Sequence, residues 1–258
     1  MQLELAETYL RQVITRSGSL LQQLSSEVTL PTTKLQPRAY DLIVNDFIIN
    51  SIREQYPSHD FISEEGPAGH LGGSGFTWVI DPIDGSDNFM RGIHAYTISI
   101  SLFQASEIIL GSVFEPYLNR LFMAVRGKGA TVNGRPLHVS SVEDLATALV
   151  ATSTYQSFVS RSASRRSSFH QVVEKTNARI SASTALDMCY VALGSFDARI
   201  MADTRVWDNS AASLLVQEAG GRVTDWEGNE NNYESSELVA SNGACHDKLL
   251  ELLKGYRI

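Results

Sequence analysis

The chain has 258 residues, of which 43% are hydrophobic, and a formal net charge of −8 at pH 7. This length suits one large domain or two smaller ones, and the hydrophobic fraction excludes an intrinsically disordered chain. The negative charge gives no electrostatic reason to expect nucleic-acid binding. A phosphorylated substrate would need local positive charge, from side chains or from metal ions.

The N-terminus and the cysteines bear on where the protein works. The first residues, MQLELAETYLRQVI, carry early acids and are not typical of a signal peptide, and no segment approaches the ~20 apolar residues of a membrane span. Cys189 and Cys245 lack CxxC or Cys/His ligand spacing, so the sequence does not support a zinc site. We therefore expect a cytoplasmic protein with two buried, reduced thiols.

The first half of the chain predicts helices followed by an antiparallel sheet. Apolar residues recur at helical spacing over 3–24 and 39–55, and the proline-containing piece between them predicts a loop. The segment from Thr97 to Phe103 alternates as a half-buried strand should, and Asn133-Gly134 predicts a hairpin turn. Strands are predicted within 60–65, 77–82, 97–103, 108–116 and 120–140. This order indicates an α+β arrangement.

From about residue 145 strands and helices alternate, which is an α/β pattern with ligand sites expected at strand ends. Strands are predicted at 148–154, 178–182, 196–202, 221–225 and 237–242, and helices at about 160–176, 184–194, 208–219 and 245–254. The basic, serine-rich stretch 160–168 is typical of a solvated loop or helix start, and its approach to a phosphate is the alternative. We expect two halves, 1–143 and 144–258, in one compact unit.

The stretch WVIDPIDGSDNF places three acids directly after an apolar strand. Asp-Pro and Asp-Gly are turn signals, so a simple turn is one interpretation. Asp81 and Asp84 converge only if the chain bends between them, and Gly85 favours such a bend. The bend also turns the Ile83 carbonyl inward, which completes an oxygen-only set that suits Mg²⁺. The next residues, 86–88, are typical of a helix start, where free N–H groups attract phosphate.

Further acids follow other predicted elements. Glu64 and Glu65 end the preceding strand, where a solvated loop is the ordinary interpretation. Asp208 stands at the start of a predicted helix, where an N-cap is as well supported as a metal ligand.

The motifs SEE, WVIDPIDGSDNF and WDNSAASLLVQEAGG, in this order, resemble the inositol monophosphatase family. This family belongs to the Mg²⁺-dependent, often lithium-sensitive sugar phosphatases. The likeness also covers YPSHDFISEE and RGKGATVNGRPLHVS and so runs along nearly the whole chain. It implies a layered αβαβα sandwich, a homodimer, two or three Mg²⁺ ions per site, and a small phosphorylated metabolite as substrate, without a nucleic-acid or membrane partner.

The resemblance also implies roles for residues. Metal binding falls to Glu64, Asp81, the Ile83 carbonyl, Asp84 and Asp208. The resemblance assigns water activation to Glu64 and to Ser86 paired with Asp41. Ser86 stands where the family usually has threonine, and Glu65 assists the metal indirectly. Substrate contacts fall to Gly85, Ser86, Ala182, Ser183, Thr184, Met201 and Asp208, with Asp87 and Arg205 nearby.

The sequence departs from the family pattern at positions that contact the substrate in inositol-specific relatives. Inositol-specific relatives carry a glutamate at the position of Met201, and a thioether cannot replace two strong acceptors. Asp203 is an alternative acceptor, and packing is an equally good interpretation of Met201 and Thr184. The resemblance places Lys34 in a shortened loop that is associated with the third metal. Inositol 1-phosphate is therefore the default substrate, with fructose 1,6-bisphosphate, histidinol phosphate and 3′-phosphoadenosine 5′-phosphate as alternatives. A non-catalytic regulatory protein on the same scaffold is the rival hypothesis.

Overall fold

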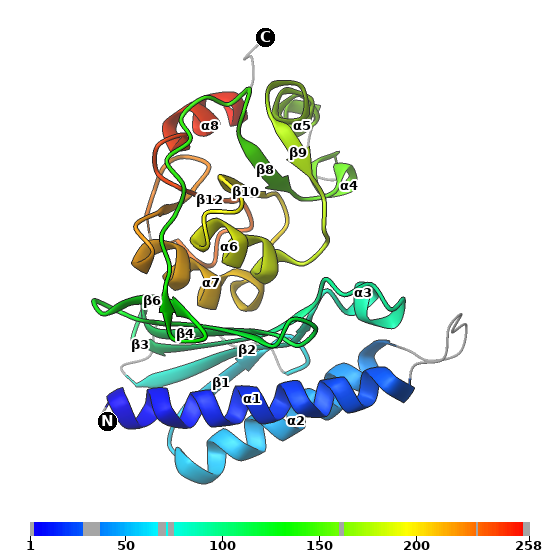
Figure 1. Ribbon diagram of the computed structural model, residues 1–258, viewed down its shortest axis with the longest axis vertical. Coiled ribbons are helices and arrows are strands. Elements are labelled where there is room, and N and C mark those ends of the chain that lie inside the picture. The colour runs from blue at the N-terminus through cyan, green and yellow to red at the C-terminus, as the bar shows by residue number, and fades with distance from the viewer. Residues whose placement is uncertain are drawn as a thin grey trace.

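The computed structural model describes residues 3–27, 37–66, 71, 75–159, 163–230 and 232–254, so Lys34 lies outside the described residues. Helices and sheets alternate in layers, in the order helices, sheet, helices, sheet, helices (Figure 1). Three hydrophobic clusters fill the spaces between neighbouring layers. The predicted αβαβα sandwich is confirmed.

The first sheet follows the chain order, and its antiparallel pairs run from β2 to β7 as predicted. Among the described residues its strands are β1 (Asp60–Ser63), β2 (Phe76–Asp84), β3 (Thr97–Gln104), β4 (Glu107–Glu115), β5 (Arg120–Val125), β6 (Gly129–Val132) and β7 (Arg135–Pro136). The prediction of a wholly antiparallel meander was wrong for β1, which pairs with β2 in parallel. Because of this pairing, the carboxyl ends of β1 and β2 lie at the same edge of the sheet. Asn133 and Gly134 both have positive φ, as the predicted hairpin turn requires.

Helices cover both faces of the first sheet. The helices α1 (Leu3–Glu27) and α2 (Pro37–Gln55) lie on one face, and α6 (Thr184–Ala192) and α7 (Val206–Glu218) lie on the other (Figure 1). The prediction that β3 is half-buried was therefore wrong, since its polar face packs on α7 instead of meeting solvent. The hydroxyl oxygens of Ser101 and Ser210 lie 2.7 Å apart across this contact. Small serine side chains let the helix approach the strand closely.

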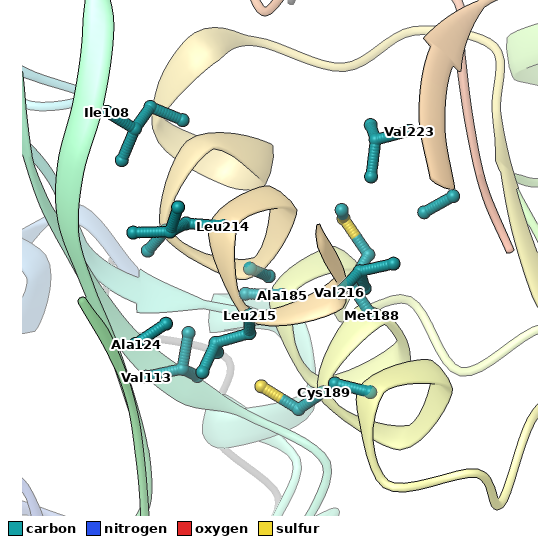
Figure 2. Packing of buried hydrophobic residues seen from close by; sticks show 14 of the residues in the cluster. Ile108, Val113, Ala124, Ala185, Met188, Cys189, Leu214, Leu215, Val216 and Val223 are labelled. Atoms are coloured by element: carbon teal, nitrogen blue, oxygen red, sulfur yellow. The ribbon is translucent and has the colours of Figure 1, made fainter. Parts of the chain in front are cut away.

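The helix α7 lies between the two sheets. Figure 2 shows Leu214, Leu215 and Val216 on this helix, between Val113 of β4 and Val223 of β11 (Arg222–Asp225). The strand β4 comes so close that a Cβ at Gly111 would lie 2.6 Å from the Ala211 carbonyl oxygen. The helix therefore has a fixed position relative to the first sheet, and its N-terminus carries Asp208.

The second sheet has the order β11-β12-β10-β8-β9, with β8, β9 and β10 parallel. Its other described strands are β8 (Leu149–Thr152), β9 (Asn177–Arg179), β10 (Ala198–Met201) and β12 (Leu238–Ser241), and its outer face is covered by α4 (Tyr155–Val159), α5 (Ala163–Lys175) and α8 (His246–Leu253). The predicted strand 178–182 was too long at its end, since β9 ends at Arg179, before the turn at Ala182, where φ is +61°. The predicted helix 160–176 corresponds to α5, with residues 160–162 outside the described residues, and α4 was not predicted.

Three further sequence predictions concern the cysteines, the basic stretch and membrane spans. Cys189 and Cys245 are free and buried, as expected. In the basic stretch, Arg165 pairs with Glu237 and lies 4.3 Å from the centre of the Trp226 ring, so it stabilises the fold locally. No helix in the described ranges is long and apolar enough to cross a membrane.

Candidate active site

The DPIDG segment bends at the end of β2. The pairing of β2 with β3 shifts register between Asp81 and Asp84, as a β-bulge does. Gly85 follows with φ of +86°, and a Cβ there would lie 2.8 Å from the Ala95 carbonyl oxygen. Only glycine avoids both penalties. The predicted bend between the two aspartates is therefore confirmed.

Glu64 and Asp81 meet at the shared edge of β1 and β2. The backbone N–H of Glu64 donates to the Ile80 carbonyl at 3.2 Å, which extends the parallel pairing beyond β1. The two carboxyl groups lie close together, and the charge of Glu64 raises the pKa of Asp81. Asp81 also accepts a hydrogen bond from the N–H of Ile83 at 3.1 Å. The Ile83 side chain is buried in the cluster beneath α1 and α2, and ligation by its carbonyl stays a prediction.

Burial and mutual repulsion raise the pKa values of the acids at this edge of the sheet. Burial raises the pKa of Asp81 well above its ordinary value, and three neighbouring carboxylates raise it further: Glu64, Asp84 and Asp208. Burial likewise raises the pKa of Asp208 to about 7, with added repulsion from Asp84 and Glu64. The four carboxylates therefore lie close enough to repel one another, and a bound cation would relieve that repulsion.

Asp84 is held by the start of α6. Its carboxylate accepts hydrogen bonds from the Ser183 hydroxyl at 2.5 Å, the Thr184 N–H at 3.0 Å and the Ala185 N–H at 2.9 Å. The Thr97 hydroxyl adds a fourth at 3.3 Å. The structure thus brings Ser183 and Thr184 to Asp84, and their contact with a substrate stays a prediction.

Asp208 is the third residue of α7 and not its N-cap. Its Oδ2 atom accepts hydrogen bonds from the Arg205 N–H at 2.7 Å and from the Thr204 hydroxyl at 3.3 Å. The predicted helix start at Asp208 was therefore late, although the carboxylate does satisfy a backbone N–H at the helix N-terminus.

A cavity of about 410 Å³ opens beside these acids. It is lined by Arg38, Asp41, Glu64, Glu65 and Ser86. Burial raises the pKa of Asp41 to about 7, with repulsion from Glu64 and Glu65. The cavity therefore brings together the residues to which the resemblance assigns water activation.

Arg38 is the functional candidate that the sequence analysis missed. Its guanidinium pairs with Glu65 at 3.1 Å at the mouth of the cavity. The available signal was its position three residues before Asp41, which places both on one face of α2.

The other predicted site residues differ in their exposure. Met201 is fully buried in the cluster between the two sheets, which favours its interpretation as a packing residue. Asp87, Asp203 and Arg205 are exposed. Ala182 borders the motif, since its carbonyl oxygen would lie 3.4 Å from a Cβ at Gly85.

The donor chemistry of the four carboxylates fits Mg²⁺, which prefers oxygen ligands. No three Asp, Glu, His or Cys side chains of the described residues form a ready metal cage. Asp84 and Asp208 each direct carboxylate oxygens to backbone N–H groups.

Comparison with known proteins gives a consistent family assignment. The model of the inositol monophosphatase family matches residues 5–257. "Nus factor SuhB" of Pasteurella multocida is 34% identical over 216 residues, covering 83% of this chain and 81% of that protein. "Fructose-1,6-bisphosphatase/inositol-1-monophosphatase" of Thermotoga maritima is 34% identical over 208 residues, covering 80% and 77%.

The solved structure of inositol monophosphatase from Anabaena superposes with a TM-score of 0.87 at 28% identity, covering 98% of this chain and 97% of that chain. The family match extends over nearly the full sequence, and the solved Anabaena structure has the same layered fold. The chain therefore belongs to the inositol monophosphatase family of phosphatases.

Proposed function

We propose that this phosphatase is a Mg²⁺-dependent phosphomonoesterase that acts on a small polyol or sugar phosphate. One observation supports the proposal: the carboxylates of Glu64, Asp84 and Asp208 all lie close enough to the buried Asp81 to raise its pKa, at the edge where β1, β2 and α7 meet. Such crowding is costly unless cations bind there.

The residues divide the work of hydrolysis. Bound Mg²⁺ would supply an activated water and neutralise charge on the phosphate and the leaving oxygen. Asp41, with a pKa near 7, is suited to accept the proton of the attacking water near neutral pH. Ser86 lines the same cavity and would relay that proton or orient the water. Gly85 and Ser86 would donate hydrogen bonds to the phosphate at the start of α3 (Ser86–Met90).

The leaving group would be recognised beyond Asp84, around Ala182, Ser183 and Thr184. Buried Met201 offers no acceptor for sugar hydroxyls. Only the family resemblance therefore supports inositol 1-phosphate as the default substrate. The Thermotoga maritima relative is called fructose-1,6-bisphosphatase/inositol-1-monophosphatase, which supports fructose 1,6-bisphosphate as the first alternative. Histidinol phosphate and 3′-phosphoadenosine 5′-phosphate are the other two alternative substrates.

Phosphate release from these four esters, measured with Mg²⁺ and after removal of metal by EDTA, tests the proposal. We expect release from at least one ester, loss of release in EDTA and recovery when Mg²⁺ is restored. Release that is unaffected by EDTA would show that the acids do not work through a metal. Adding Li⁺ to the active assay tests the lithium sensitivity of the wider group.

A regulatory role is the second candidate, and the relatives called Nus factor SuhB support it. Under this hypothesis the chain acts by binding a partner. Absence of release from every ester, in a folded protein supplied with Mg²⁺, would favour it.

We also propose a homodimer. Ile93, Tyr117 and Leu118 are exposed apolar side chains, and the Tyr117 ring stacks on His94 at 3.7 Å, which supports an association surface there. Sedimentation of the purified chain tests this proposal, and a monomer at all concentrations would contradict it.

A further inference from the structure

The guanidinium of Arg199 is buried on one face of the second sheet. It lies on β10, between Ala240 of β12 and Ala151 of β8, and only 3% of the residue is exposed. Side chains alternate along a strand, so Arg199 shares a face with Met201, which packs in the cluster formed with α6 and α7. The guanidinium therefore lies on the side of the sheet that carries α6.

The partner of Arg199 is Asp187 in the first turn of α6. The Nε and Oδ2 atoms are 3.3 Å apart, and Asp187 is fully buried. Neither of these two atoms makes a hydrogen bond within the described residues. A buried ion pair with incomplete hydrogen bonding stabilises a fold poorly, because desolvation of both charges opposes their attraction. A contribution to folding alone does not account for this pair.

Both members of the pair hold the loop 181–185. The Ser181 hydroxyl donates to Asp187 Oδ1 at 2.6 Å, and Arg199 Nη2 donates to the Thr184 hydroxyl oxygen at 3.3 Å. Between these anchors, Ala182 adopts a φ of +61°, a conformation that residues other than glycine rarely take. The surroundings must enforce such a conformation, and the two anchors flank it directly.

The loop in turn orients Asp84. Its hydroxyl and N–H groups at 183, 184 and 185 donate to that carboxylate. We propose that Arg199 and Asp187 are positioning residues, which hold the loop 181–185 and thereby the Asp84 carboxylate in the orientation for metal binding. The effect on turnover rests on the proposed function, whereas the effect on the loop does not.

The double substitution Arg199→Met/Asp187→Asn separates positioning from charge burial. It removes both charges together, so no buried charge is left without a partner, and the new amide at position 187 keeps an oxygen that accepts from Ser181. The matched control is Arg222→Met/Asp247→Asn, which removes an exposed ion pair of 2.7 Å far along the sheet. If the double variant does not fold, Ser181→Ala removes the hydroxyl that donates to Asp187, without a change of charge, and receives the same measurements.

Hydrogen exchange of the metal-free protein is the first measurement. We expect the Thr184 and Ala185 amides to exchange faster by on the order of tenfold in the double variant, with no change in the control. Unchanged exchange at both amides in a folded variant would overturn the inference. This readout does not depend on phosphatase activity, so its failure is distinct from the failure of the proposed function.

Calorimetric titration with Mg²⁺ and steady-state kinetics follow on the same proteins. We expect Mg²⁺ affinity and kcat each to fall by on the order of tenfold, with KM nearly unchanged, because the substrate contacts stay in place. Wild-type affinity and kcat in the double variant would show that the pair serves the fold alone and would overturn the inference.

Discussion

Ser183 donates its hydroxyl hydrogen to the Asp84 carboxylate over 2.5 Å, although 99 positions separate the two residues in the chain. The bond joins the end of β2, in the first sheet, to the start of α6, which packs against the second sheet. The candidate active site is therefore assembled from both halves of the chain. Any change that loosens this contact should affect turnover more than stability.

Ser183→Ala tests this contact. Loss of a hydrogen bond to a charged group should lower kcat by roughly ten- to hundredfold, because the Asp84 carboxylate gains freedom to rotate. Ser183→Thr keeps the hydroxyl and should restore most of the activity. Both variants should be compared by kcat and by thermal melting. Equal kcat in the alanine variant and the wild type would contradict the role assigned to this bond.

Asp84→Asn tests the proposed metal ligand. The amide has one weaker acceptor oxygen, so Mg²⁺ affinity and kcat should each fall by ~100-fold or more while the chain still folds. Asp46→Asn is the control, since Asp46 is exposed on α2. Phosphate release and Mg²⁺ titration measure the effect. Retained activity in the folded Asp84→Asn variant would reject the metal site.

Gly85→Ala tests the backbone of the motif, and Gly129→Ala is its matched control. Both glycines have φ of +86°, but a Cβ at Gly85 would lie 2.8 Å from the Ala95 carbonyl oxygen, whereas a Cβ at Gly129 has no neighbour within 4 Å. Left-handed strain should cost each variant about 1–2 kcal/mol. The clash should cost Gly85→Ala roughly 2 kcal/mol more and abolish activity. Equal unfolding free energies in urea would show that no clash exists.

The sequence predicted the parts of the site that depend on local chain geometry. The bend at Asp81 and Asp84 follows from the spacing of two acids around Ile83 and from Gly85, and the structure has a bulge there. Long-range contacts could not be predicted in this way. Arg199 and Asp187 carry no local pattern that marks them as a pair, and they meet only because β10 packs on α6.

Burial was misjudged for a similar reason. The alternation of β3 is that of a strand with one face in solvent, yet Ser101 on its polar face meets Ser210 of α7. A serine on a strand has the same pattern whether water or a helix covers it. Only the position of α7, which is determined by the whole sandwich, decides between these alternatives.

His246 gives a prediction for stability at acid pH. It is fully buried on α8, and its ring nitrogens lie 2.8 Å from the Thr224 hydroxyl and 2.7 Å from the Ser241 hydroxyl. Burial lowers its pKa from 6.5 to about 4, with a further contribution from Arg222. Between pH 6.5 and 4 the unfolded chain therefore binds a proton that the folded chain does not, so this residue's contribution to stability is present above pH 6.5 and is lost as the pH falls to 4.

The loss amounts to about 3 kcal/mol at pH 4, since each pKa unit is worth about 1.4 kcal/mol. The free energy of unfolding is measured by urea titration at several pH values. Asp41 and Asp208, whose pKa values are raised to about 7, change stability in the opposite direction in every variant. The effect of His246 therefore appears as a difference: between pH 6.5 and 4 the wild type should lose about 3 kcal/mol relative to His246→Asn, even if the stability of that variant at pH 7 is lower. The exposed His138 supplies the control His138→Asn, which should retain the wild-type slope. Equal slopes in all three proteins would show that His246 does not carry the acid sensitivity of the fold.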